Sequence, residues 1–197
     1  YQGYTGDFNN WVNYGKWVNS LLAQRTELTE PTKTKIRELT ADLTCEREKV
    51  KAVYRYVQGK TRYVAVMEGI GGLQPMLATD VDKFAYGDCK ALSNYTRSLL
   101  SAIGIQSYYT TIGADNVSIR DVDFASKDQT NHVILTVPLQ NDTVLLECTN
   151  PYAPFGYLGA ANSNRKAVMI TEMGGQLIDM PYFSAADNLF SQVMKVD

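Results

Sequence analysis

The sequence predicts an α+β domain in which helices come first and an antiparallel sheet follows. Three observations support this class. Residues 8–58 carry apolar side chains at helical spacing, residues 131–149 alternate as a β-hairpin does, and a turn at 86–88 leads directly into an amphipathic helix. Runs of helices followed by runs of strands favour α+β over a parallel α/β sheet. The helix after the turn is therefore expected to pack on the antiparallel sheet.

The composition is that of an ordinary globular protein. Of 197 residues, 45% are hydrophobic and 20% are charged, enough to bury the core of one domain, with or without an appendage. The net charge of −2 gives no electrostatic reason to expect nucleic acid or an anionic membrane as a partner. No apolar run is long enough to span a bilayer, and no signal peptide is visible. Because the chain begins at Tyr1, we expect it to be part of a longer protein with flanking domains.

Three helices are expected in the first 60 residues, where apolar side chains recur at helical spacing in segments 8–24, 31–43 and 46–58. Thr29 precedes Pro31 and is the expected N-cap of the second helix. The aromatic stripe of the first helix is interpreted as core rather than as a ligand site. The region to about residue 45 is thus predicted to be a helical N-terminal region, followed by a core from about 46 to 160.

A strand at 61–66 is expected to lead into a glycine-rich loop at 68–75. This loop lacks the lysine and hydroxyl of a phosphate-binding P-loop, so nucleotide binding is not expected. We expect it instead to form a wall of a cleft. The Gln74 side-chain amide is a candidate donor to an oxyanion, and a structural role in the turn is the alternative.

Cys89 lies in the first turn of the helix that follows Gly87 and Asp88 and ends at Gly104. A helix N-terminus presents free N–H groups and a partial positive charge, which favour a thiolate and a developing oxyanion. Cys89 is therefore the candidate nucleophile.

The other two cysteines, Cys45 and Cys148, are expected to be small buried hydrophobic residues. Three cysteines without a close-spaced pair argue against a disulfide framework and against a structural zinc site.

His132 is the single histidine of the chain, so it is the candidate base for a cysteine nucleophile. It begins a strand at 131–137, which a polar turn at 140–142 joins to a second strand at 143–149. A hairpin brings the start of the first strand beside the end of the second. His132 and Glu147 are thus expected to lie close enough for the carboxylate to orient the imidazole.

The remaining segments are predicted from simpler signals. A strand is expected at 105–112, and the polar segment 113–130 is interpreted as a lid or specificity loop. A β-hairpin is expected around Gly174 and Gly175, and residues 190–197 have the pattern of a strand. Segment 161–197 is accordingly predicted to hold this hairpin and the start of a following β region.

The order of a cysteine opening a helix, a histidine on a strand and an acid on the next strand resembles the transglutaminase-like superfamily of papain-like cysteine enzymes. Segments 61–64 and 71–75 resemble the bacterial branch, whose core lies within larger, exported proteins. The resemblance covers about residues 49–159. The matching motifs are Gly87-Asp88-Cys89-Lys90, Asn131-His132-Val133-Ile134 and Leu146-Glu147-Cys148-Thr149-Asn150-Pro151.

This resemblance implies a papain-like or transglutaminase-like core over residues 1–160 and acyl transfer from an amide or peptide substrate through a Cys89 thioester. His132 and Glu147 complete the triad; the superfamily usually has aspartate at the position of Glu147. Gln74, Asp88 and Asn131 are the expected substrate-binding residues. No cofactor or metal is expected, the substrate is a peptide or protein, and the location is exported, periplasmic or at the cell surface.

Two alternatives stay open. The first is a catalytically inactive transglutaminase-like module that serves binding or assembly within a multidomain protein. The second is a mononuclear metal site built from Cys89, His132, Glu147 and Cys148, which fits the chemistry of ligands but not their usual spacing.

Overall fold

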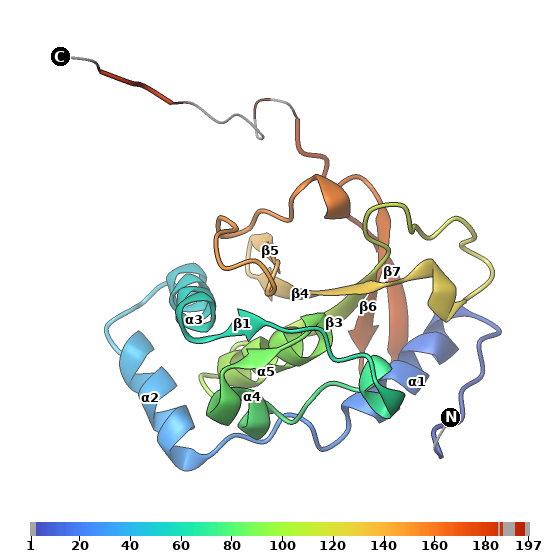
Figure 1. Cartoon of the computed structure of the whole chain (residues 1–197), viewed down its shortest axis with the longest axis horizontal. Coiled ribbons are helices and arrows are strands. Elements are labelled where there is room, and N and C mark those ends of the chain that lie inside the picture. The colour runs from blue at the N-terminus through green and yellow to red at the C-terminus, as the bar shows by residue number, and fades with distance from the viewer. Residues whose placement is uncertain (1–2, 185, 187–191, 196–197) are drawn as a thin grey trace.

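The computed structural model describes residues 3–184, 186 and 192–195, and its architecture is α+β, as the sequence predicts. An antiparallel sheet is covered by helices that precede most of its strands in the chain (Figure 1). The helices are α1 (Trp11–Leu22), α2 (Glu30–Thr40), α3 (Glu46–Lys60), α4 (Ala78–Phe84) and α5 (Cys89–Ser101), with short 3₁₀ turns η1 (Gly69–Gly72), η2 (Lys127–Gln129) and η3 (Ala160–Asn162). The strands are β1 (Arg62–Tyr63), β2 (Tyr86–Gly87), β3 (Tyr108–Ile112), β4 (His132–Leu139), β5 (Asp142–Leu146), β6 (Lys166–Thr171) and β7 (Gly174–Asp179).

The main sheet has five strands in the order β5-β4-β3-β6-β7, and every neighbouring pair is antiparallel. The predicted hairpin is β4 and β5, in which Leu135 pairs with Leu146. His132 pairs with Ile112 of β3, so β4 begins beside the end of β3. Among the residues described, no helix is long and apolar enough to cross a membrane.

Helix α5 is the central helix of the fold and is buried along most of its length. Its Leu92, Tyr95 and Leu99 pack in one core with Val53 of α3 and Leu135 of β4. Gly104 follows the helix with φ +75°, a left-handed conformation that glycine adopts without steric cost. The start of α5 is therefore a fixed point between the helical layer and the sheet.

Helix α4 is not expected from the sequence, because its seven residues are too few to show a helical period. It carries Asp82, a polar junction between helices. Asp82 accepts hydrogen bonds from Tyr95 of α5 at 2.6 Å, Lys60 of α3 at 2.5 Å and Thr32 of α2 at 2.7 Å. These contacts join the helical region to α5.

Helix α1 packs against β6 and β7 at the opposite edge of the sheet from β5 (Figure 1). Glycines make this close approach possible. A Cβ atom on Gly15 would lie 1.8 Å from the Gly175 backbone nitrogen, and one on Gly175 would lie 2.2 Å from the Trp11 carbonyl oxygen. Only hydrogen at these positions leaves room for the two backbones.

Two segments differ from the sequence predictions. The 61–66 strand shortens to β1, which pairs in parallel with β2 rather than joining the main sheet. The β6–β7 hairpin forms as predicted but belongs to the sheet that carries His132, because β6 pairs with β3. Half of the strand predicted at 190–197 lies outside the described residues, and the described half, residues 192–195, forms no strand.

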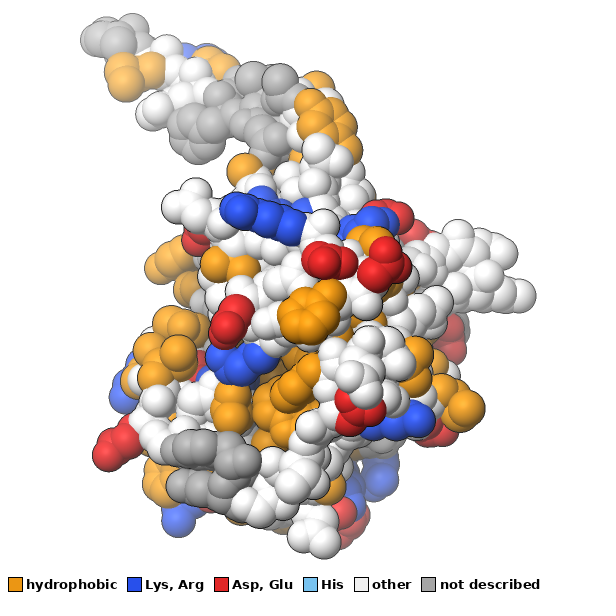
Figure 2. All heavy atoms as spheres, turned by 90° about the vertical axis from the view of Figure 1, so that its right-hand side faces the viewer, with side chains coloured by type: hydrophobic (Ala, Val, Ile, Leu, Met, Phe, Trp, Pro, Cys, Tyr) orange, Lys and Arg blue, Asp and Glu red, His pale blue; other side chains and the backbone are white. Residues whose placement is uncertain are grey.

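The face seen from the right of Figure 1 carries hydrophobic side chains near its middle, with acidic and basic side chains interspersed around them (Figure 2). This face has no extended patch of one charge sign, in keeping with the net charge of −2. It therefore offers no electrostatic surface of the kind that binds a polyanion.

Candidate active site

Cys89 is the first residue of α5, and Asp88 is the N-cap. Asp88 has extended backbone angles, and its Oδ1 accepts a hydrogen bond from the Ala91 amide at 3.0 Å. Its other oxygen forms an ion pair with the Lys90 ammonium, and both side chains are nearly fully buried. The carboxylate thus fixes the first turn of the helix and the position of the Cys89 thiol.

His132, at the start of β4, lies between Cys89 and Glu147. Its Nε2 is 2.8 Å from Glu147 Oε2, and the neighbouring Cys89 side chain helps to raise the pKa of the ring. The sequence register explains the first contact, because Glu147 directly follows β5 and lies diagonally across the hairpin from His132. The structure therefore brings the three predicted triad residues together.

The Glu147 carboxylate is hydrogen-bonded through both oxygens. Oε1 accepts from the Thr149 amide at 3.0 Å and from the Thr149 hydroxyl at 2.5 Å. Oε2, the oxygen that contacts His132, also accepts from Asn162 Nδ2 at 2.9 Å. The Tyr54 hydroxyl of α3 donates to the Glu147 carbonyl at 3.0 Å, which fixes the backbone as well. Glu147 is thus held in one orientation toward the imidazole.

Asn162 is a residue of this site that the sequence does not reveal. It lies in η3, 15 residues after Glu147, and no motif links the two positions. Its amide also donates to the Leu158 carbonyl at 3.2 Å. Both hydrogen bonds are donated by the amide nitrogen, and among the described residues the buried Oδ1 has no hydrogen-bond partner. The Asn162 amide is therefore oriented with its nitrogen toward Glu147.

Electrostatics favour the charged forms of the histidine and glutamate. Burial opposes protonation of His132, but the neighbouring Cys89 side chain and the nearby Glu147 carboxylate outweigh it and raise the pKa of His132 from 6.5 to about 10. Burial raises the pKa of Glu147, yet the His132 contact and the two Thr149 hydrogen bonds lower it overall. An imidazolium beside a carboxylate and a thiol is the arrangement that stabilises a thiolate nucleophile.

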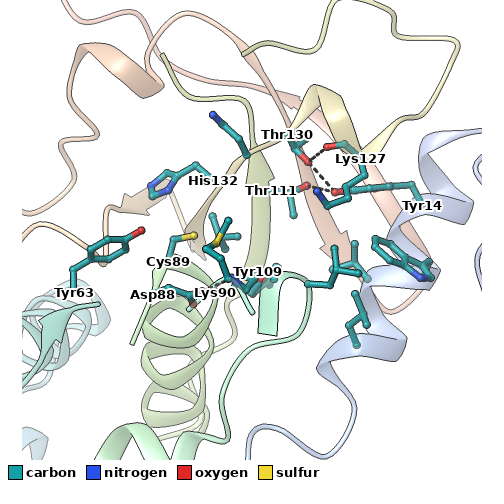
Figure 3. A pocket seen from close by; sticks show the side chains of 18 residues that line it. Tyr14, Tyr63, Asp88, Cys89, Lys90, Tyr109, Thr111, Lys127, Thr130 and His132 are labelled. Carbon is teal, nitrogen blue, oxygen red and sulfur yellow. Dashed lines mark hydrogen bonds and ion pairs between the residues drawn. The ribbon is translucent and has the colours of Figure 1, made fainter. Parts of the chain in front are cut away.

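A cavity of about 230 Å³ opens beside Cys89 and His132. Figure 3 shows Cys89, His132 and Tyr63 toward one end and Tyr14, Thr130 and Lys127 toward the other. Gly72 and Leu73 of the glycine-rich loop line it, so this loop is a wall of the cleft. Tyr63 is half exposed, and burial followed by the nearby Cys89 and acidic groups raises its pKa.

The three residues predicted to bind substrate lie in different surroundings. Asn131 lines the cavity, and its Oδ1 accepts a hydrogen bond from the Ala114 amide at 2.6 Å. Asp88 also lines it but is engaged in capping α5. Gln74 does not line it. Its amide donates to the Tyr4 hydroxyl at 2.7 Å and to the Leu21 carbonyl at 3.1 Å, a structural role in the packing of the loop.

The other cysteines differ from each other. Cys148 is buried as expected, and burial raises its pKa to about 12. Cys45 is exposed, so its prediction as a buried residue is wrong; it precedes the first residue of α3, where its side chain makes no cap hydrogen bond. Within the described ranges, no group of three or more His, Cys, Asp or Glu side chains is arranged to hold a metal ion.

No family model matches the sequence, and no curated protein matches it. A solved structure from Parabacteroides distasonis, described as a "putative protease", is similar in fold, with a TM-score of 0.63 and 18% sequence identity over 86% of this chain. The chain spans 31% of the length of that protein. A "putative cysteine protease" from Cytophaga hutchinsonii gives a TM-score of 0.49 at 15% identity. The match covers 85% of this chain and 59% of the length of that protein. The P. distasonis structure shows that the predicted α+β fold with its antiparallel sheet occurs in a solved protein.

Proposed function

We propose that this chain is a transglutaminase-like cysteine enzyme that cleaves or transfers an acyl group from an amide or peptide substrate. The observation that carries the proposal is the contact chain from Cys89 through His132 to Glu147, built from a helix N-terminus and two adjacent strands. The description of the P. distasonis structure as a "putative protease" agrees with a peptide substrate. A location outside the cytoplasm is proposed on the family resemblance alone.

The proposed reaction begins with the Cys89 thiolate, which attacks the amide carbonyl and forms a carbon–sulfur bond. The carbonyl electrons move onto oxygen, and the Cys89 backbone N–H at the positive end of α5 stabilises that oxyanion. When the carbon–nitrogen bond breaks, the His132 imidazolium gives its proton to the departing amine and a thioester remains. Glu147 holds the ring orientation throughout.

The second half of the reaction discharges the thioester. Neutral His132 accepts a proton from the incoming nucleophile, whose oxygen or nitrogen bonds to the carbonyl carbon while the carbon–sulfur bond breaks. Water as acceptor makes the protein a peptidase or amidase, and an amine as acceptor makes it an acyltransferase. Both reactions use the same three residues.

The test measures the thiol itself, because it then needs no knowledge of the substrate. Iodoacetamide alkylation of each cysteine is followed by peptide mass mapping from pH 5 to 10, in a Cys45→Ser background that removes the exposed thiol. We expect Cys89 to label near pH 6, whereas buried Cys148 is spared. His132→Ala should slow the alkylation of Cys89 near pH 6 by about tenfold or more, because the thiolate loses its imidazolium partner.

The inactive binding module predicts a different result. If Cys89 is alkylated no faster than an ordinary thiol, or if the pH dependence of its alkylation is the same in the parent and in His132→Ala, the three residues do not act together. That outcome would replace the enzyme by the binding or assembly module.

A further inference from the structure

The cavity beside Cys89 is closed on one side by residues that precede the region of family resemblance. Trp17, Val18 and Leu21 of α1 line it, together with Met67 and Leu73 from the segment around η1. These side chains are apolar and present no carboxylate. A group that enters from Cys89 therefore meets a hydrophobic surface, which favours burial of an apolar side chain over a polar one.

Most polar groups on the cavity wall are already hydrogen-bonded within the protein. The Tyr14 hydroxyl bonds to the Thr111 hydroxyl at 3.3 Å and to the Thr130 hydroxyl at 3.0 Å. Asp88 and Lys90 pair with each other, and the Asn131 amide contacts Ala114. These groups satisfy one another, so they give little reason for a polar ligand to displace water from the wall.

Lys127 is the exception among the charged residues of the wall. It lies in η2, within the segment predicted to be a specificity loop, and in the described part of the chain it forms no ion pair. Figure 3 places it beyond Thr111 as seen from Cys89 and His132. An ammonium group without a protein partner at the far end of an apolar cavity is complementary to an anionic group on the ligand.

We propose that this cavity is a subsite for an acyl donor whose side chain is large and apolar, preferably aromatic, and which carries a carboxylate where Lys127 can reach it. The volume of about 230 Å³ accommodates an aromatic side chain. This inference rests on the proposed function, since it assigns the acyl group that Cys89 receives. It adds the class of substrate that the residues of the triad do not specify.

Four p-nitrophenyl esters test both halves of the proposal: N-acetyl-glycine, N-acetyl-phenylalanine, N-succinyl-glycine and N-succinyl-phenylalanine. In each, Cys89 sulfur bonds to the carbonyl carbon, the carbon–oxygen bond breaks and p-nitrophenolate leaves. The thiol proton stays on His132. The release of p-nitrophenolate gives the rate of acylation, whichever acceptor later discharges the thioester.

We expect phenylalanine esters to acylate Cys89 about tenfold faster than glycine esters. Succinyl esters should exceed acetyl esters by about two- to fivefold at low salt, because an exposed ion pair contributes modestly. Leu73→Ala and Leu73→Trp, which empty or fill the subsite, should each reduce the phenylalanine preference. Lys127→Ala should abolish the succinyl preference and Lys127→Glu should reverse it.

Matched controls lie outside the cavity. Lys16→Ala removes an exposed lysine of α1, and Leu39→Ala removes a partly exposed leucine of α2. Neither should alter the two preferences. Iodoacetamide, which is too small to fill the subsite, reports the reactivity of Cys89 in every variant.

The outcomes separate the subsite from the nucleophile. Equal acylation by all four esters, with rapid alkylation of Cys89, would overturn the subsite and leave the enzyme intact. A phenylalanine preference together with no effect of Lys127→Glu would overturn the proposed contact between Lys127 and a ligand carboxylate. The subsite for an apolar side chain would stand. A Cys89 that reacts with neither the esters nor iodoacetamide would overturn the proposed function and this inference with it.

Discussion

The Asn162 amide nitrogen lies 2.9 Å from Glu147 Oε2, the same carboxylate oxygen that contacts His132 Nε2 at 2.8 Å. A carboxylate oxygen that accepts from both donors cannot rotate away from the imidazole without losing the bond to Asn162. Asn162 therefore acts as a positioning residue for Glu147, and through it for His132.

Replacement of Asn162 should change the pH profile of the thiol rather than its accessibility. In Asn162→Ala the carboxylate loses a charge-assisted hydrogen bond, so the imidazolium is less well stabilised and the alkylation of Cys89 near pH 6 should slow by about three- to tenfold. Asn162→Ser should restore part of the lost rate, and Ser163→Ala, next in the chain and only partly exposed, should cause no change. An unchanged profile in Asn162→Ala would contradict the positioning role.

Glu147→Gln keeps the shape of the side chain but removes its charge. We expect acylation by N-acetyl-phenylalanine p-nitrophenyl ester to fall at least tenfold, while Cys89→Ala abolishes it. The urea concentration at the midpoint of unfolding should change little, because the side chain keeps its shape. Full activity of Glu147→Gln, on an ester that Cys89→Ala does not turn over, would rule out the orienting role of Glu147.

Glu147→Asp installs the residue that is usual in the resembling superfamily. Here the longer side chain is fitted to its contacts with His132, Asn162 and Thr149, so a shorter one cannot keep all of them. We expect a lower acylation rate than in the parent, between those of the parent and Glu147→Gln. A faster Glu147→Asp enzyme would show that glutamate is a handicap at this position.

The raised pKa of His132 makes stability depend on pH. Its pKa rises from 6.5 to about 10 on folding, so the protonated ring stabilises the fold fully below pH 6.5, and this contribution is lost as pH rises toward 10. The difference in free energy of unfolding between the parent and His132→Gln should therefore be larger at pH 6 than at pH 10. Urea titrations at both pH values measure this difference. A difference that is larger at pH 10 than at pH 6 would contradict the stabilising role of the protonated ring.

Gly15→Ala tests the contact between α1 and β7. The added methyl would lie 1.8 Å from the Gly175 nitrogen, so we expect a loss of about 2 kcal/mol or more in the free energy of unfolding. Gly59→Ala in α3 is the matched control, because its methyl meets nothing within 4 Å and alanine favours a helix by about 0.5–1 kcal/mol. Equal stabilities for the two variants would mean that α1 can move from the sheet at little cost.

Local signals in the sequence predict much of this molecule. The helix that begins at Cys89 and ends before Gly104, and the hairpin that carries His132 and Glu147, depend on residues close together in the chain. The hairpin register is enough to predict that His132 meets Glu147, whereas Cys89 is paired with His132 because the chain has a single histidine and because of the family resemblance. The α+β class follows from the same local patterns.

Features that depend on distant pairings are not predicted. The β6–β7 hairpin has a clear local signal, but nothing in it indicates that β6 pairs with β3. Asn162 reaches Glu147 through a loop without regular periodicity, and Cys45 is exposed although cysteine is usually buried. In each case the tertiary contact, not the local propensity, decides the outcome.

The glycine contact between α1 and β7 also imposes an order on assembly. Helix α1 is synthesised before the surface on which Gly15 rests, because that surface contains Gly174 and Gly175 and follows some 160 residues later. The cavity wall made by Trp17 and Leu21 is then completed only after β7 has joined the sheet. A nascent chain that already contains Cys89, His132 and Glu147 therefore still lacks one wall of the cavity beside them.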